Sequence, residues 1–308
     1  MVHRFAVATC IVALLPISVG ALVTTLRAGM AFSDWPTSDG HNMLLYPWLN
    51  DLRNSDRFAE HGHRLAGVVI GLTSIGLLVV TFLRERRRWV RGYTVTILIA
   101  VIAQGMLGGA RVLMDANVMA MVHSITGALF FTQCVAFAML TARGAADAEP
   151  GRIHLSGTIR AIVILLPVIV LGQYLLGGMF RHLGRMMYEH LAGAAMVALW
   201  GIVAVVCLLR TKQPQLSRAG IWIAAALLLQ LGLGASAWVT KLNVPALGWV
   251  VSTGSPAAVV FRSLHTVGGM FLLAATTLSA VQVVRQPGWF DNPGRLLTDV
   301  GAAKGGLA

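Results

Sequence analysis

The chain has 308 residues, of which 56% are hydrophobic and only 12% are charged, and its mean hydropathy is +0.74. Soluble folds carry about a quarter charged residues, whereas the apolar residues here fall in runs of about 20, the length that crosses a hydrocarbon core. A soluble globular protein is therefore excluded, and the composition predicts an integral membrane protein.

Apolar runs between charged or Pro/Gly breaks predict eight membrane-spanning helices. Their approximate bounds, in chain order, are 5–26, 63–83, 93–113, 118–140, 159–180, 188–209, 219–239 and 258–284. The first run is too long for the apolar part of a signal peptide, and no clear Ala-x-Ala cleavage site follows it. No Arg- and Ser-rich transit sequence precedes it, which favours a bacterial inner membrane over an organelle.

The net charge of +12 is explained by the orientation of these helices. Loops after the even-numbered spans, together with both termini, hold 15 of the 24 basic and five of the 12 acidic residues. The positive-inside rule then predicts that both termini are cytoplasmic. In a soluble protein the same charge would suggest nucleic acid, but here that class of partner is excluded.

The three cysteines lie within apolar runs, at Cys10, Cys134 and Cys207. They provide no basis for a structural disulfide, a zinc site or a Cys-x-x-Cys-His haem attachment.

Short motifs recur between the two halves of the chain, in the same orientation. Met121-Val-His123-Ser-Ile-Thr-Gly127 resembles Ser263-Leu-His265-Thr-Val-Gly-Gly269, and related segments begin at Gln104, Gln173 and Gln230. A parallel repeat of four spans predicts an all-α membrane protein of two pseudo-repeated four-helix bundles. We expect an amino-terminal half over 1–143, a carboxy-terminal half over 156–286 and a cytoplasmic tail over 287–308.

Four histidines lie near the outer ends of the even-numbered spans, at similar depths: His63, His123, His190 and His265. A single membrane histidine is more often an interhelical hydrogen-bonding group, but four at repeat-equivalent positions indicate a functional site. Gly67, Gly127 and Gly269 follow their histidines by four residues, hence on the same helix face. Small residues are also common at helix contacts in membranes. Haem held by one imidazole pair in each bundle accounts for both patterns.

Glu60 lies three residues before His63, on the same face if the helix extends that far. It is a candidate proton donor beside the first site, although pairing with Arg64 would equally explain a carboxylate here. Arginines at the outer span ends suit haem carboxylates, with snorkelling to the interface as the alternative. These arginines are Arg64, Arg111, Arg181 and Arg262. We interpret His61 and His182 as polar interface residues.

Taken together, Glu60-x-x-His63-Arg64, Gln104-Gly-Met-Leu-Gly-Gly109 leading to His123, and the repeated His190 and His265 resemble the haem A synthase family. The resemblance runs from Asp34-Trp35-Pro36 through the eighth span. It implies oxidation of the C8 methyl of haem O, through a hydroxymethyl stage, to the formyl group of haem A.

The resemblance also implies roles for the matching residues and for partners. His63 and His123 would hold the substrate haem O or product haem A, with Glu60 catalytic, and His190 and His265 would ligate a haem b. The partners we expect are haem O synthase, cytochrome oxidase assembly factors, an electron donor, membrane lipid and a second copy of the chain.

Two departures separate the chain from many bacterial members of the family. No outer loop contains a cysteine, and the connection between the fifth and sixth spans, about 181–187, is very short. Two other classes of function fit part of the pattern. A non-catalytic dihaem b-type cytochrome relaying electrons from quinol would use the same histidines but has no need of Glu60. A small-solute permease would place its polar residues at mid-membrane.

Overall fold

The structure is a computed structural model that describes residues 1–142, 155–242 and 254–286. Within these ranges it contains eight long α-helices, one short 3-10 helix and no strand beyond an isolated bridge between Ser38 and His41. The helices are α1 (Val2–Leu26), η1 (Trp48–Asp51), α2 (Ser55–Arg84), α3 (Arg88–Met114), α4 (Asn117–Leu140), α5 (Gly157–Leu183), α6 (Met187–Arg210), α7 (Pro214–Leu242) and α8 (Pro256–Val284). The tail expected over 287–308 lies outside the described residues.

Each long helix has a window apolar enough to cross a membrane, so the chain is a multi-pass membrane protein. Large side chains that face away from the bundles are apolar, including Leu83 and Leu228, which are more than 70% exposed. Such a surface is unsuited to water and suited to lipid, where every backbone polar group is satisfied inside a helix.

The helices extend beyond the predicted apolar runs at most of their ends. The largest difference is at α2, which begins at Ser55 rather than near residue 63. The side chain of Asn54 accepts a hydrogen bond from the backbone N–H of Arg57 (3.2 Å) and caps this polar first turn. Two polar turns of α2 therefore project past the apolar run and support the loop that precedes them.

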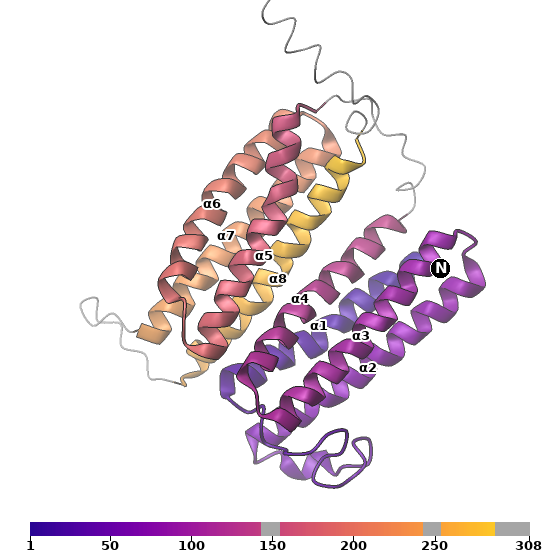
Figure 1. Cartoon of the computed structure of the whole chain (residues 1–308), viewed down its shortest axis with the longest axis vertical. Helices are drawn as coiled ribbons and strands as arrows, with labels where there is room; N and C mark the ends of the chain where they lie inside the picture. Colours follow the sequence, from indigo (N-terminus) through magenta and orange to yellow (C-terminus); the bar gives the residue numbers. More distant parts are fainter. Residues whose placement is uncertain (143–154, 243–253, 287–308) are drawn as a thin grey trace, which may run out of the picture.

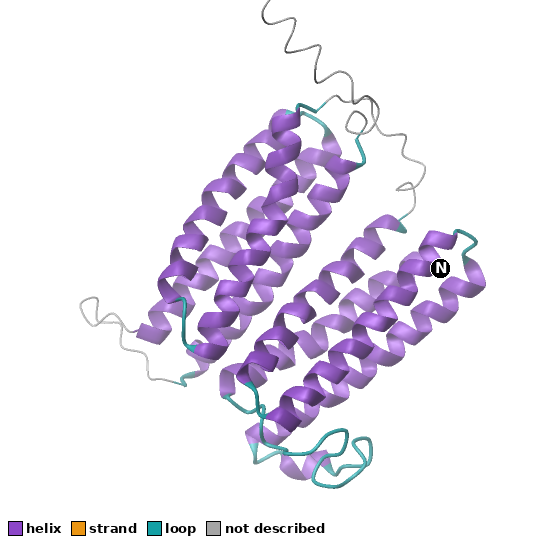
Figure 2. Ribbon diagram, in the orientation of Figure 1, coloured by secondary structure: helices purple, strands orange, loops and turns teal. Residues whose placement is uncertain are grey.

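Two four-helix bundles stand side by side, α1–α4 and α5–α8 (Figure 1). Within each bundle, consecutive helices pack together and the first also packs against the fourth. The bundles meet through α1 and α4 on one side and α5 and α8 on the other. Figure 2 shows that the loops gather at the two ends of this helical block. The predicted fold class is confirmed.

The interface between the bundles contains a half-buried cation. The guanidinium of Arg181, near the end of α5, donates to the carbonyl oxygen of Ala21 (2.7 Å) and the hydroxyl of Thr25 (2.8 Å) on α1. Its other terminal nitrogen donates to the hydroxyl of Thr266 and to the carbonyl oxygen of Arg262 on α8. Arg181 therefore connects three helices of two bundles, an interhelical role that the sequence did not indicate.

Candidate functional site

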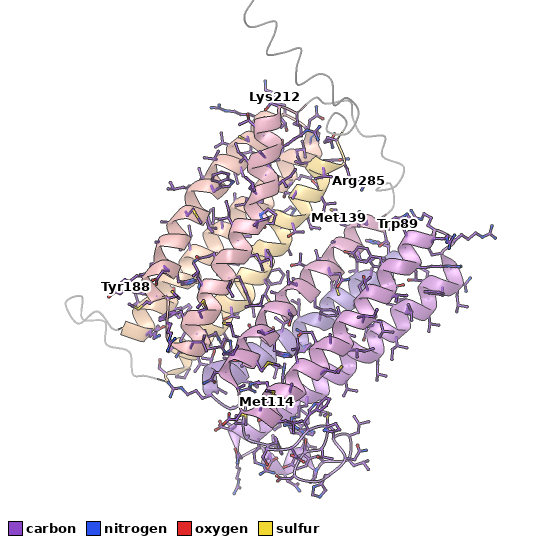
Figure 3. All side chains as sticks on the ribbon, in the orientation of Figure 1. Trp89, Met114, Met139, Tyr188, Lys212 and Arg285 are labelled. Atoms are coloured by element: carbon purple, nitrogen blue, oxygen red, sulfur yellow. The ribbon has the colours of Figure 1, made fainter. Side chains whose placement is uncertain are left out.

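The structure brings the four repeated histidines together as two pairs, one inside each bundle. The imidazoles of His63 on α2 and His123 on α4 have ring centroids 6.1 Å apart, with ring planes at 90°. Those of His190 on α6 and His265 on α8 are 6.2 Å apart, with ring planes at 80°. Both pairs lie toward the end of the molecule where Figure 3 labels Met114 and Tyr188, opposite Lys212 and Arg285. The two halves thus present the same arrangement.

A glycine on the preceding odd-numbered helix backs each histidine. A Cβ atom at any of these glycines would crowd an imidazole, with Cε1 as its nearest atom. The pairs and distances are Gly20 with His63 (2.8 Å), Gly108 with His123 (3.3 Å), Gly177 with His190 (2.9 Å) and Gly234 with His265 (3.0 Å). The absence of a side chain at these positions lets each ring lie directly on the neighbouring helix backbone.

A glutamine stands one turn before three of these glycines, on α3, α5 and α7. Gln104 donates to the carbonyl oxygen of His123 (3.1 Å). Gln173 donates to the carbonyl oxygen of His190 (2.8 Å), and its Nε2 lies 3.0 Å from Nδ1 of that histidine. Gln230 occupies the equivalent place on α7, and Pro16 the one on α1. These contacts fix the backbone from which the histidines project.

The glycines that were expected to clear the face of a macrocycle differ from one another. Nothing lies within 4 Å of a Cβ built on Gly67, so that face of α2 is open. At Gly127 the amide nitrogen of Gln104 fills the space (2.8 Å), and at Gly269 the ring of Tyr174 does so (3.2 Å). The last two glycines make room for side chains of the adjacent helices, which the spacing within one helix could not reveal.

The histidine pairs fit the axial ligands of a haem. Two imidazoles bound to one metal ion from opposite sides, each at about 2 Å, have ring centroids about 6 Å apart. Nδ1 of His63, His123 and His265 is buried and makes no hydrogen bond of good geometry with a described residue. The described residues contain no cluster of three or more His, Cys, Asp or Glu side chains that could hold a metal ion. Two protein ligands suffice for haem, because the macrocycle supplies the other four.

A cavity of about 420 Å³ surrounds the second pair, within the range usual for small-molecule and cofactor sites. His190 and His265 line it, together with apolar residues of α5–α8. Lys241 and Arg262 also line it, and so does Arg181, whose guanidinium is hydrogen-bonded to α1 and α8. No described acceptor hydrogen-bonds to the guanidinium of Arg262. The cavity therefore combines two imidazoles, an apolar wall and cations suited to carboxylates.

The first pair lies below an ordered cap formed by the loop between α1 and α2. One Glu60 oxygen accepts from the backbone N–H of Ala31 (2.6 Å) and of Phe32 (3.3 Å). The other accepts from Arg64 (2.7 Å), and both side chains of this ion pair are less than 10% exposed. Arg64 also donates to the carbonyl oxygens of Asp34 (2.8 Å) and Thr37 (2.7 Å). Glu60 and Arg64 thus hold the cap on the start of α2.

Other contacts complete the cap. Arg111, at the end of α3, donates to the carbonyl oxygen of Gly29 (2.6 Å). The carboxylate of Asp34 accepts from the backbone N–H groups of Asp39 (3.0 Å) and Gly40 (2.9 Å). Desolvation raises the pKa of Asp34, but hydrogen bonds from Thr37, Gly40 and Asp39 outweigh it, so the pKa is lowered overall. The loop is therefore tied down by both backbone and charged groups.

The two remaining outer histidines have different surroundings. His61 is buried in the cap, with Nδ1 3.1 Å from the hydroxyl of Ser38 and its ring 4.8 Å from that of Tyr46. This agrees with the polar interface role expected for it. His182 lies near the end of α5, and its Nε2 is buried without a hydrogen-bond partner.

The comparison with known families is decisive for the first half of the chain. Residues 3–188 match the family COX15-CtaA, described as cytochrome oxidase assembly protein. The chain belongs to this family. A search of curated proteins found no match to the chain.

Within this COX15-CtaA member, the match spans α1–α5 and therefore includes His63, His123, Glu60 and the cap. It ends two residues before His190, so the second pair lies beyond it. The internal repeat of structure nevertheless gives each histidine of that pair a backing glycine, as in the first pair.

Sequence reasoning missed the glycines that back the histidines, and it also missed Lys241. The signal for the glycines was present as Gln-x-x-x-Gly on three odd-numbered spans, Gln104 to Gly108, Gln173 to Gly177 and Gln230 to Gly234. Lys241 follows the predicted seventh span and becomes part of the cavity because α7 extends to Leu242.

Proposed function

We propose that this cytochrome oxidase assembly protein is a haem A synthase. In this proposal it oxidises the C8 methyl of haem O to a hydroxymethyl group and then to the formyl group of haem A. Family membership supports the biological context. The observation that carries the chemistry is the presence of two separated histidine pairs, each with the spacing that one haem requires. One pair can bind the substrate while the other binds a resident cofactor.

The proposed division of labour follows the asymmetry between the halves. His63 and His123 of the amino-terminal half, residues 1–143, hold the substrate haem. His190 and His265 of the carboxy-terminal half, residues 156–286, ligate haem b, which supplies one-electron transfer when bound. The cap over the first pair, held by the ion pair of Glu60 and Arg64, supports this choice. The second pair has no counterpart of this ion pair among the described residues.

The residues of the first site have separate roles in this proposal. Glu60 accepts hydrogen bonds from three donors, so it acts by positioning the cap beside the substrate. Arg64 and Arg111 anchor the cap through loop carbonyls, and the nitrogens of Arg111 that remain can meet a substrate carboxylate. Gly67 leaves open space beside the pair. The cap excludes water from the reacting edge.

The surroundings of the second pair support a haem b there. Arg262 and Lys241 would face its carboxylates from the end of the cavity. Gly269, with Tyr174 against it, forms part of the cavity wall. Tyr174 of α5 and Ser124 of α4 both line the cavity. Ser124 is the next residue along the chain after His123. The second site therefore reaches the helix that carries a ligand of the first.

Location and partners follow from the same proposal. The protein would lie in a bacterial inner membrane with both termini cytoplasmic, as the charge bias indicates. It would receive haem O from a haem O synthase, take electrons from a separate donor and deliver haem A to cytochrome oxidase assembly.

The test is haem extraction and mass analysis from membranes that contain the full chain and a supply of haem O. Haem A or its hydroxymethyl precursor should form with the wild-type protein and with His41→Ala, a change in the exposed part of the cap, but not with His63→Ala. If haem b is bound while haem O remains unchanged, the protein is an electron-relay cytochrome instead. If no haem is bound, the ligand assignment itself is wrong.

A further inference from the structure

A second and larger hollow lies between the bundles, toward the end opposite the histidines. It has a volume of about 1060 Å³ and is lined by α4 on one side and by α7 and α8 on the other. Its walls are mainly apolar, with Phe131, Val135, Trp222 and Leu278 among them. Nε2 of Gln282 on α8 lies 3.6 Å from the sulfur of Met139 on α4, which joins the two walls. None of the four paired histidines lines this groove.

The two ends of the groove are chemically different. At the deep end, the rings of Phe131 and Phe271 meet edge to face, with centroids 5.3 Å apart. At the other end lie Arg218 and Arg285, with three glutamines near them. Figure 3 shows Arg285 beside the gap between the bundles, across from Met139. From Phe271 to Arg285, α8 rises about 21 Å. The hydrocarbon of one leaflet is about 15 Å thick, so the groove is longer than one leaflet's hydrocarbon is thick.

The basic end suits a phosphate group. Arg218 is exposed, and no described acceptor hydrogen-bonds to its guanidinium. Arginine forks bind phosphate oxygens in a bidentate manner, and basic clusters at a membrane boundary attract anionic lipids. The exposed Arg210 and Lys212 at the same end add to the positive field.

We propose that this groove binds one anionic phospholipid, with its phosphate between Arg218 and Arg285 and an acyl chain along α8 toward Phe271. The lipid fills the space between the bundles where their helices do not pack against each other. The site is separate from the histidine pairs, so the proposal does not depend on the haem chemistry.

Native mass spectrometry of the full-length protein, released from membranes of phosphatidylglycerol and phosphatidylethanolamine, tests this. We expect a retained phosphatidylglycerol adduct, and Arg218→Ala with Arg285→Ala should weaken its binding about 25-fold. Arg210→Ala, at the same end but outside the groove, is the matched control and should retain the adduct. Equal retention of both lipids by the wild type, or an unchanged adduct in the double variant, would overturn the proposal. If the wild type instead carries a haem with a prenyl chain and the double variant loses it, the groove binds the haem and not a phospholipid, and the proposal is also overturned.

A second measurement does not depend on the arginine variants. Trp222 lines the groove, so the fluorescence that is lost in Trp222→Phe reports on its contents. Phosphatidylglycerol with brominated acyl chains should quench this component more than brominated phosphatidylethanolamine at the same mole fraction. Equal quenching by the two lipids would mean that the groove is bathed in bulk lipid, and the specific site would be rejected.

Discussion

Gly177 on α5 lies directly against the imidazole of His190 on α6, so that a Cβ atom at position 177 would stand 2.9 Å from Cε1 of the ring. The partner imidazole, His265, lies inside the same bundle, and the centroids of the two rings are 6.2 Å apart. The orientation of the His190 imidazole is thus set by a missing side chain on a neighbouring helix.

The first prediction follows from this contact. Gly177→Ala should displace the His190 ring and weaken haem binding by the carboxy-terminal half about 10-fold or more, as disturbed outer contacts of a metal ligand do. The absorbance of bound haem per purified protein measures the change. Gly172→Ala on the same helix meets no atom within 4 Å and should bind haem normally. Equal loss in both variants would point to a general effect on α5 instead.

The second prediction concerns the independence of the two pairs. His190→Ala and His265→Ala should remove the signal of one haem and leave haem at the first pair, because each pair lies within its own bundle. His63→Ala and His123→Ala should do the reverse and abolish oxidation. Haem-specific spectra of the four purified variants provide the measurement. Loss of both haems from every variant would reject the assignment of one pair to each bundle.

The arrangement of the spans and the pairing of the histidines could be predicted from the sequence. Apolar length determines where a chain crosses a membrane, and the repeat of His123 in His265 places the two residues at the same depth in related helices. Both inferences depend on spacing along the chain, which folding preserves.

The partners of those histidines on other helices could not be predicted in the same way. In lipid, a helix can be apolar on all sides, so its sequence does not reveal which face meets a neighbour. Gly108 and Gly105 look equivalent in the sequence, yet only the first lies against His123, and nothing is within 4 Å of the second. Arg181 similarly suggested an interfacial cation, whereas its hydrogen bonds cross the boundary between the bundles.

The third prediction concerns the ion pair beneath the cap. Glu60→Gln removes the charge that holds Arg64 while it keeps the shape of the side chain, and breaking a buried pair of this kind costs about 3–5 kcal/mol. We expect faster hydrogen exchange in residues 27–54 and a lower yield of oxidised haem. Glu189→Gln is the control, because Glu189 is exposed and forms no ion pair with a described residue. An unchanged cap together with full activity would remove Glu60 from the site.

The fourth prediction concerns Arg181 as the connection between the bundles. Arg181→Gln loses charge-assisted hydrogen bonds to α1 and α8, each of which contributes about 1.5–3 kcal/mol, and the shorter side chain cannot reach both helices. The melting temperature in detergent should fall, and the bundles should separate before either unfolds. The melting curve, with cysteine crosslinks between α1 and α8 as a readout of separation, measures both effects. Arg185→Gln removes an exposed charge just past the end of α5 and should leave both unchanged. If the two variants melt alike, the contacts of Arg181 do not hold the bundles together, and the apolar packing of α1 and α4 on α5 and α8 does so alone.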